Sequence, residues 1–430
     1  MKTDIVIAGT GVGGLYCALN IPSNKKIIMV TKDDADRSDS FLAQGGICVL
    51  KNDDDYDSYF EDTMHAGHYE NNKESVDIMI RSSRDVINDL EDFGVRFTKK
   101  DGEFVYTKEG AHSIPRILFH KDITGKEITS HLLETVKKRS NITIIEHFTV
   151  VDIIEENGEC KGIVGFNKDG ELKTIYADYT VLGTGGIGGL YKHSTNYRHL
   201  TGDSLAIALK HNIKLQNIDY IQIHPTTLYS KKKGRRFLIS ESVRGEGAVL
   251  FNSRMQRFVD ELLPRDVVAE AIYKEMKKDN KPYVWLSMKP IPADKIKSHF
   301  PNIYKRCLEE GYDVTKECIP VVPSQHYFMG GIDVDKYSKT SMDRLYAVGE
   351  TACNGVHGKN RLASNSLLES LVFAKRAANH IMDGYSEINI NSEYVPDTNQ
   401  YKNYENEYKK MVLDEIEREK KEHERYNNEA

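Results

Sequence analysis

The chain opens with a short apolar run, residues 5–8, that leads directly into the glycine-rich stretch GTGVGG and then into LYCAL. A strand, a glycine turn and a helix in this order form the fingerprint of a dinucleotide-binding α/β fold. In that fingerprint Gly9 makes the tight turn, Gly11 lets the backbone approach a pyrophosphate, and Gly14 lets the helix pack on the strand. Glycine-rich turns are common, but the position of this one, directly after the first strand, strengthens the prediction.

The second predicted strand, KKIIMVTK, departs from this fingerprint at its end. An acidic residue usually stands there and accepts hydrogen bonds from the adenosine ribose, whereas this chain has Thr31 and Lys32. The adenosine half of a dinucleotide must therefore be held differently, and Lys32 is a candidate for that contact.

Residues 345–373 supply a second nucleotide-type segment near the other end of the chain. They combine an apolar strand, the acidic Glu350, a basic loop with glycines, and an apolar helix that begins near Ser366. Glu350 can accept hydrogen bonds from sugar hydroxyls, and the N–H groups that open the helix can face the electron-rich pyrimidine edge of a reduced flavin. A buried strand and an amphipathic helix would be the simpler interpretation, but it leaves Asn360 and Arg361 unexplained. The two segments together predict that the chain binds FAD.

Composition excludes several classes of function. The 430 residues carry a net charge of −6, which gives no electrostatic signature of nucleic acid binding, and no stretch is apolar for long enough to span a membrane. No signal peptide precedes the first strand, so we expect a cytoplasmic protein. The six cysteines show no CxxC spacing, and His65 and His68 lack further ligands at metal spacing, so neither zinc nor an iron–sulfur cluster is expected.

The order of predicted elements is that of an α/β fold with an interruption. Residues 179–191 read as a strand that runs into a second glycine turn. Asp203 then opens a helix, either as a plain N-cap or as a cofactor contact.

Between residues 218 and 326 the predicted strands become shorter and the helices scattered, and then the nucleotide-domain pattern returns. We therefore expect a discontinuous Rossmann-type FAD-binding domain (1–217 and 327–385), an α+β capping domain (218–326) and a helical tail (386–430). We expect the tail to form one docked helix, because its apolar and aromatic residues recur at helical spacing. They are Tyr401, Tyr404, Tyr408, Met411 and Ile416.

The inserted region holds groups suited to a reaction. Its motifs HPTTL, ISESVRGEGAVLFN, LPRDVVAEAI and PSQHYFMGG each place a cationic or hydrogen-bonding side chain in a turn or at a helix start. Any one of them alone would more often be structural, since an Arg-Asp pair usually lies at the surface. Four such motifs together with Arg361 predict a dicarboxylate site, because guanidinium groups bind planar carboxylates in a bidentate way while neutral donors fix their orientation.

The motifs AQGGI, TGDS, HPTTL, RGEGA, PRDVV, HYFMGGI and GETACNGVHGKNRLASNSL occur together over about residues 1–380. As a set they are highly specific, and with them the chain resembles the succinate dehydrogenase/fumarate reductase flavoprotein family, most closely its members that oxidise L-aspartate. The FAD contacts that the resemblance implies are Gly9, Thr10, Gly11, Gly13, Gly14, Lys32, Ser40, Gln44, Gly45, Gly46, Asp203, Glu350, Ser366 and Leu367. The implied substrate contacts are His224, Ser240, Glu241, Arg244, His326 and Arg361.

Arg265 is implied as the proton donor or acceptor, with His224, Glu241 and His326 as its catalytic neighbours. A guanidinium with a pKa above about 12 is a poor proton carrier by itself, so Glu241 or Asp266 would have to relay the proton.

One position separates this chain from the flavoproteins of membrane complexes. Those proteins carry a histidine that tethers FAD covalently, and the matching residue here is Asp39 in SDSFLAQGG. We therefore expect FAD to be bound without a covalent bond. The chain also lacks most of their C-terminal helical region, which argues against docking in a membrane assembly.

The resemblance implies oxidation of L-aspartate to iminoaspartate by hydride transfer to flavin N5, with oxygen or fumarate as electron acceptor. This reaction would be the first step of de novo NAD biosynthesis, with quinolinate synthase as a transient partner. A soluble fumarate reductase or a succinate dehydrogenase-type flavoprotein would share every cofactor motif. A non-catalytic FAD-binding protein would tolerate the loss of Arg265 and Arg361.

Glu109, in the loop YTKEGAHSIPR, bears on the choice between L-aspartate and succinate. An exposed loop charge beside Lys108 would be the more common role for it. The aspartate-oxidising members carry an EGGHS-type loop, however, and this chain matches it at Glu109 and His112. A carboxylate in a cationic pocket repels a plain dianion but attracts the ammonium group of aspartate, so we expect Glu109 to supply specificity.

Overall fold

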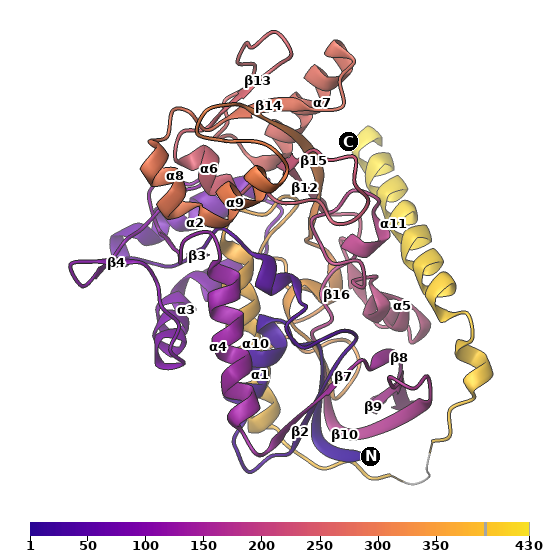
Figure 1. Cartoon of the computed structure of the whole chain (residues 1–430). Coiled ribbons are helices and arrows are strands. Elements are labelled where there is room, and N and C mark those ends of the chain that lie inside the picture. Colours follow the sequence, from indigo (N-terminus) through magenta and orange to yellow (C-terminus); the bar gives the residue numbers. More distant parts are fainter. Residues whose placement is uncertain (391–393, 430) are drawn as a thin grey trace.

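The computed structural model describes residues 1–390 and 394–429 (Figure 1). Its largest sheet has seven strands in the order β7, β2, β1, β10, β9, β8, with β17 beside β10. The strands are β1 (Lys2–Ala8), β2 (Ile27–Thr31), β7 (Ile142–Glu146), β8 (Thr149–Glu156), β9 (Glu159–Phe166), β10 (Leu172–Leu182) and β17 (Leu345–Ala347). Because β7, β2, β1, β10 and β17 run parallel, their carboxyl ends share one edge, where such sheets bind ligands.

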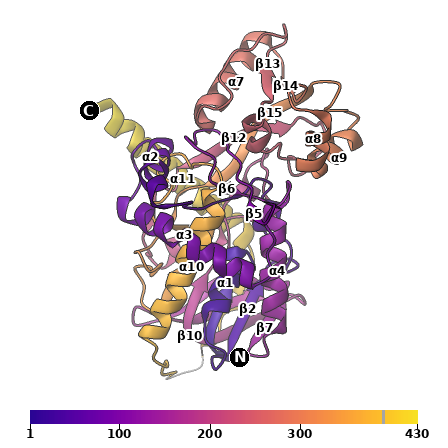
Figure 2. The same ribbon diagram turned by 90° about the vertical axis from the view of Figure 1, so that its left-hand side faces the viewer.

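Both faces of this sheet are buried. Ile5 and Ile7 of β1 pack into one hydrophobic core, while Val6 and Ala8, which point the other way, pack into a second. The helices that complete the first core are α1 (Val12–Asn20), α3 (Lys73–Asp92), α4 (Thr124–Lys138) and α10 (Asn365–Asp383). Figure 2 shows α1, α4 and α10 in front of the sheet. The second core includes α5 (Asp203–Lys210).

A second unit, at the top of Figure 1, is built on the sheet β12, β15, β14, β13. Its elements are β12 (Ile221–Leu228), α6 (Glu241–Gly245), β13 (Val249–Phe251), α7 (Arg265–Asp279), β14 (Val284–Ser287), α8 (Ala293–His299), α9 (Pro301–Glu309) and β15 (Ile319–Phe328). It has a hydrophobic core of its own. Since β12 and β15 pair antiparallel, the chain enters and leaves this unit side by side. The predicted interrupted α/β architecture is confirmed.

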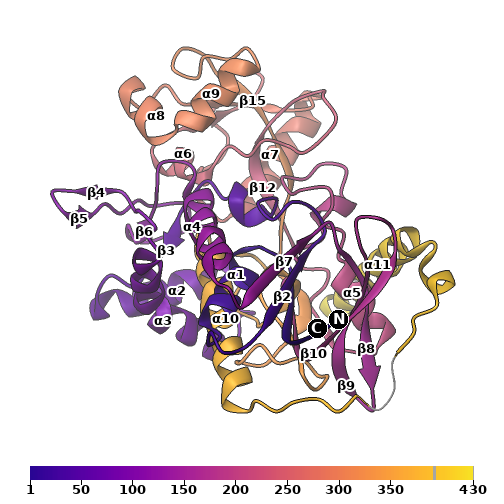
Figure 3. The ribbon, with the colours of Figure 1, turned by 60° about the horizontal axis from the view of Figure 1, so that its bottom comes forward.

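The C-terminal helix α11 (Tyr404–Glu429) lies along the outside of the molecule next to α5 (Figures 1 and 3). Tyr408 and Ile416 are buried and Tyr404 and Met411 half-buried, so a helix docks as predicted. Tyr401 is also buried, but it lies in a short 3₁₀ turn (Thr398–Tyr401) before this helix rather than on it. Farther along, the Glu419 carboxylate accepts hydrogen bonds from two backbone N–H groups at residues 217 and 218, just before β12. Residues 391–393 and 430 of the predicted tail lie outside the described residues.

Short elements complete the fold around the cavity described below. They are α2 (Tyr56–Ala66), β3 (Ile47–Cys48) paired with β6 (Ile117–Leu118), and the sheet of β11 (Leu215–Gln216), β16 (Gly331–Asp333) and β18 (Ala352–Cys353). Within the described ranges no helix is long and apolar enough to cross a membrane.

Candidate active site

One cavity, at the carboxyl edge of the parallel strands and under β12 and β15, collects nearly all of the sequence-predicted site residues. Those predicted to bind the cofactor that line it are Gly9, Thr10, Gly11, Gly13, Gly14, Lys32, Ser40, Gln44, Gly45, Gly46, Asp203, Glu350, Ser366 and Leu367. Those predicted at the substrate are Glu109, His224, Ser240, Glu241, Arg265, His326 and Arg361. Arg244 lies behind this wall rather than in it, next to Glu241.

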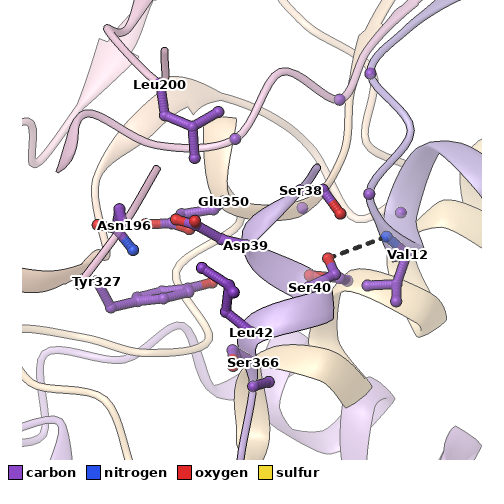
Figure 4. Close-up of a pocket in the computed structure, with 18 of the residues that line it drawn as sticks. Val12, Ser38, Asp39, Ser40, Leu42, Asn196, Leu200, Tyr327, Glu350 and Ser366 are labelled. Atoms are coloured by element: carbon purple, nitrogen blue, oxygen red, sulfur yellow. Dashed lines mark hydrogen bonds between the residues drawn. The ribbon is translucent and has the colours of Figure 1, made fainter. Parts of the chain in front are cut away.

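The first glycine turn is shaped by close backbone approaches. Gly9 has φ +114°, and a Cβ there would overlap the carbonyl oxygen of Gly183 at the end of β10. A Cβ on Gly14 would overlap the carbonyl oxygen of Gly9. At the start of α1 the N–H of Val12 donates to Ser40 Oγ at 3.1 Å (Figure 4). A bare backbone turn at a helix N-terminus fits a pyrophosphate.

The end of β2 has an acidic group after all, although it comes from another segment. Lys32 Nζ lies 2.8 Å from Asp203 Oδ2 and donates to Thr201 Oγ1 at 3.0 Å. Thr201 Oγ1 donates in turn to Asp203 Oδ1 at 2.7 Å. Gly202, not Asp203, occupies the N-cap of α5, so the N-cap interpretation is wrong. Asp203 thus places a carboxylate beside Lys32 at the end of β2.

Several buried polar atoms of the lining have no partner among the described residues. They are Ser38 Oγ, Asp39 Oδ2, Gln44 Oε1, His224 Nε2 and Arg361 Nε. Buried polar groups are rarely left unpaired in folded proteins, so these atoms indicate a polar ligand.

Asp39 and Glu350 lie beside each other in this lining (Figure 4). Burial raises the pKa of Asp39 to about 7, and burial together with the charge of Asp39 raises the pKa of Glu350 to about 8. A carboxyl group that keeps its proton near neutral pH can donate a hydrogen bond to a ligand hydroxyl as well as accept one. The glycine turn, the unpaired polar atoms and these carboxyls together fit FAD, which carries a pyrophosphate and several hydroxyls.

At the other end of the cavity Arg265 is held by two buried groups. Its Nε donates to Glu241 Oε2 at 2.5 Å, and one of its terminal nitrogens donates to Gln222 Oε1 at 2.8 Å. Arg244 approaches the same Glu241 oxygen at 3.5 Å from behind. Burial raises the pKa of Glu241, but Arg265 and Arg244 favour its charged form so strongly that the pKa lies below its ordinary value.

Two histidines face each other near Arg265, with the ring centroids of His224 and His326 5.1 Å apart. Burial, and then the charge of Arg265, hold the pKa of both well below the ordinary value, so both rings are neutral. The N–H of Thr226 donates to His224 Nδ1 at 3.2 Å, which leaves the proton of that ring on Nε2. His224 therefore offers a neutral donor to a ligand.

Arg361 comes from the loop before α10. It donates to Ser366 Oγ at 2.8 Å, and its guanidinium lies 4.3 Å from the ring centre of Tyr327. Burial, followed by the charge of Arg265, lowers the pKa of Arg361 to about 10. It remains a cation at neutral pH.

Glu109 is buried, with 2 % of its surface exposed, so the interpretation as a surface loop charge is wrong. Its two carboxylate oxygens accept hydrogen bonds from Ser242 Oγ and Ser364 Oγ, each at 2.5 Å. Burial and then the charge of Glu241 raise the pKa of Glu109, while the two hydroxyls act in the opposite direction.

The loop that carries Glu109 is anchored by His112 and Arg116. His112 Nε2 lies 3.0 Å from the Ala363 carbonyl oxygen, and the buried Arg116 bonds His112 Nδ1 at 3.1 Å and Asp55 at 3.0 Å. Burial, and then Arg116, lower the pKa of His112 to about 4. The loop is therefore fixed by neutral and paired groups rather than free at the surface.

Gln222 was missed by the sequence analysis. It accepts from Arg265, and it donates to Asn360 Oδ1 at 2.9 Å and to the Arg361 carbonyl at 2.8 Å. The signal was present, because Gln222 precedes His224 by two positions on a strand, and such residues share a face. Asp266, the alternative relay, pairs with His68 at 2.9 Å near the surface instead.

Comparison with known proteins shows to which family a chain with this site belongs. The FAD binding domain family matches residues 4–367. The chain is 52% identical over 417 residues to the L-aspartate oxidase of Clostridium perfringens. The aligned residues cover 96% of this chain and 94% of that protein. It belongs to the L-aspartate oxidase family. An L-aspartate oxidase of Clostridium acetobutylicum is also 52% identical, over 91% of both chains.

The flavoprotein fold of this family is shared with a solved structure. A variant of FrdA from E. coli quinol fumarate reductase superposes with a TM-score of 0.84 at 31% identity, covering 89% of this chain and 70% of that one. The predicted resemblance to the succinate dehydrogenase/fumarate reductase flavoproteins, and with it an FAD-dependent oxidoreductase, is confirmed.

Proposed function

We propose that this chain oxidises L-aspartate to iminoaspartate, with oxygen or fumarate as the electron acceptor, in the first step of de novo NAD biosynthesis. The observation that carries the proposal is a buried carboxylate, Glu109, in the wall of a cavity that also holds two arginines and two neutral histidines. A site for plain dicarboxylates has no use for this carboxylate, whereas a substrate with an ammonium group does. When bound, FAD supplies the hydride acceptor.

Arg265 and Arg361 would bind the substrate carboxylates, with His224 and His326 as neutral donors that fix their orientation. Ser240 and Ser364 are further polar groups at this end of the cavity. Fixed cations hold a dianion in one pose, so little orientational freedom remains to be lost when the reaction occurs. Arg244 would act through Glu241, because its side chain lies behind that residue.

Proton movement to or from the substrate would use the chain Arg265, Glu241, Arg244. Glu241 bridges both guanidinium groups through one oxygen, at 2.5 Å and 3.5 Å. A carboxylate between two arginines can exchange a proton more readily than a guanidinium alone, since carboxyl groups titrate far below pH 12. This arrangement supports Glu241, rather than Asp266, as the relay.

Glu109 would bind the substrate ammonium. Replacing it by glutamine removes the charge and keeps the shape. We expect Glu109→Gln to lower kcat/KM for L-aspartate at least tenfold, about 1.4 kcal/mol, while fumarate reduction stays equal or improves. If both activities fell together, Glu109 would be only a structural part of its loop.

The test of the function is anaerobic mixing of the purified yellow protein with L-aspartate, succinate or fumarate while flavin absorbance is recorded. L-aspartate should bleach the flavin, and fumarate should restore the colour. Bleaching by succinate but not by L-aspartate would favour the alternative, a fumarate reductase or succinate dehydrogenase-type protein.

FAD would be bound non-covalently, since Asp39 stands where a tethering histidine would be needed. Residues 218–326 would cap a discontinuous FAD-binding domain. We place the protein in the cytoplasm, in keeping with its free cysteines, most of them buried. Iminoaspartate would pass to quinolinate synthase as a transient partner.

A further inference from the structure

Ser242 touches Glu109 from outside the cavity. It is the second residue of α6 and is buried, with 7 % of its surface exposed. Its Oγ donates to Glu109 Oε1 at 2.5 Å. The cavity lining includes Ser240 and Glu241 on the same segment, but Ser242 lies behind them. Ser242 can therefore act on a ligand through Glu109, or through Ser240, to which it is also hydrogen-bonded.

The direction of this hydrogen bond is fixed by a neighbouring hydroxyl. Ser240 Oγ donates to Ser242 Oγ at 3.2 Å, and Ser240 Oγ accepts the N–H of Ser242 at 3.3 Å. Ser242 thus receives one hydrogen bond and has its only hydroxyl proton free for the carboxylate. Linked hydroxyls of this kind strengthen one another, and the final acceptor is Glu109.

The other Glu109 oxygen is held from the cavity side. Ser364 Oγ donates to Oε2 at 2.5 Å. A Cβ on Gly45 would lie 2.6 Å from Oε1, so the backbone of Gly45 closes the remaining side. Ser364 lines the cavity, where a ligand can take up its hydroxyl, whereas Ser242 does not. Ser242 can therefore keep its hydrogen bond to Glu109 when the cavity is occupied.

Burial and the charge of Glu241 oppose the charge of Glu109, while its two hydroxyl donors and the charge of Arg265 favour it. The side chain is buried, and Glu241 is the second carboxylate nearby. A buried carboxylate beside another one takes up a proton unless hydrogen bonds or cations favour its ionised form. A protonated Glu109 would no longer attract an ammonium group.

We propose that Ser242 is a positioning residue for substrate selection, which keeps the Glu109 carboxylate ionised and directed at the amino group of the substrate. This role rests on the proposed function, in which Glu109 binds the ammonium of L-aspartate. It assigns Ser242 no contact with the substrate and none with the cofactor.

The test compares Ser242→Ala with the parent holoenzyme between pH 6 and pH 9. In the variant the acid limb of kcat/KM for L-aspartate should move up by about one pH unit, because a lost hydrogen bond to the ionised form raises the pKa of Glu109. The loss in kcat/KM for L-aspartate should approach tenfold only on the acid side of this limb, should come from a higher KM with kcat nearly unchanged, and should shrink as the pH rises, while fumarate reduction is maintained. Ser242→Thr, which keeps a hydroxyl, should restore the parent profile.

A double-mutant cycle then isolates the route of the effect. In a Glu109→Gln background, Ser242→Ala should change kcat/KM for L-aspartate less than twofold, because its effect passes through the carboxylate. Superimposable pH profiles of parent and Ser242→Ala would overturn the positioning role, as would an equal loss of aspartate oxidation and fumarate reduction. If the parent holoenzyme itself failed to oxidise L-aspartate, the proposed function would be wrong, which is a separate outcome visible before any variant is made.

Discussion

Replacing Arg265 by lysine keeps a positive charge but removes the two-sided geometry of the guanidinium. In the structure Arg265 donates from different nitrogens to Glu241 at 2.5 Å and to Gln222 at 2.8 Å. One ammonium on a flexible chain cannot reproduce both bonds and also present a fork to a carboxylate. A lysine therefore loses one charge-assisted hydrogen bond to the substrate carboxylate in the transition state, which is worth about 3 kcal/mol.

This loss corresponds to a fall in kcat/KM for fumarate of roughly a hundredfold or more. We would measure fumarate reduction by the chemically reduced holoenzyme, together with FAD content, which should stay close to the parent value, and thermal unfolding, which should show a folded protein that has lost about the stability of one buried hydrogen bond. Arg254→Lys is the matched control, since Arg254 is exposed in the same capping region, and it should behave like the parent. Near-normal fumarate turnover in Arg265→Lys would remove Arg265 from the chemistry and refute the reasoning.

Because Asp39 replaces the tethering histidine, acid precipitation should release all FAD into the supernatant; flavin retained in the pellet would contradict this. Arg361→Leu should raise the KM for dicarboxylates at least tenfold with a smaller change in kcat, since a lost carboxylate partner weakens ground state and transition state alike; an unchanged KM would place Arg361 away from the substrate. Burial raises the folded pKa of Glu350 to about 8, above roughly 4.3 in an unfolded chain, so its carboxyl destabilises the apoprotein increasingly as pH rises through that interval. Apoprotein of Glu350→Gln should therefore gain more in melting temperature at pH 8 than at pH 5, while binding FAD more weakly; an equal gain at both pH values would show that Glu350 does not titrate there.

The glycine turns and the order of the elements could be predicted from the sequence because their causes are local. A turn that needs a positive φ or a close backbone approach, as at Gly9, shows itself by its own residue type. The start of α3 is less evident from an apolar pattern. The helix begins at Lys73, in a polar first turn, because Asn72 caps it by accepting the N–H of Ser75.

Contacts between distant segments could not be read from the sequence. Lys32 pairs with Asp203, which is far away in the sequence. The residues near Lys32 therefore do not show that a carboxylate lies at the end of β2. Arg244 is next to Glu241 because it is three residues farther along α6, and its bond to the Glu261 carbonyl turns it away from the cavity. The burial of Glu109 depends on hydroxyls from two other segments, and only the family resemblance pointed to it.

The pairing of β17 with β10 has a consequence for how the protein is made. The first strand and helix emerge from the ribosome early, but β17, Glu350 and the start of α10 follow only after the whole capping unit has been synthesised. Until then the β10 edge that β17 will cover, and the face of α1 that α10 will cover, stay open to the solvent. Pairings between such distant segments form slowly and leave partly folded chains prone to aggregation. The flavin cavity is thus completed near the end of synthesis. The yield of holoenzyme should therefore depend on how well the partly folded chain is protected from aggregation until β17 has been synthesised.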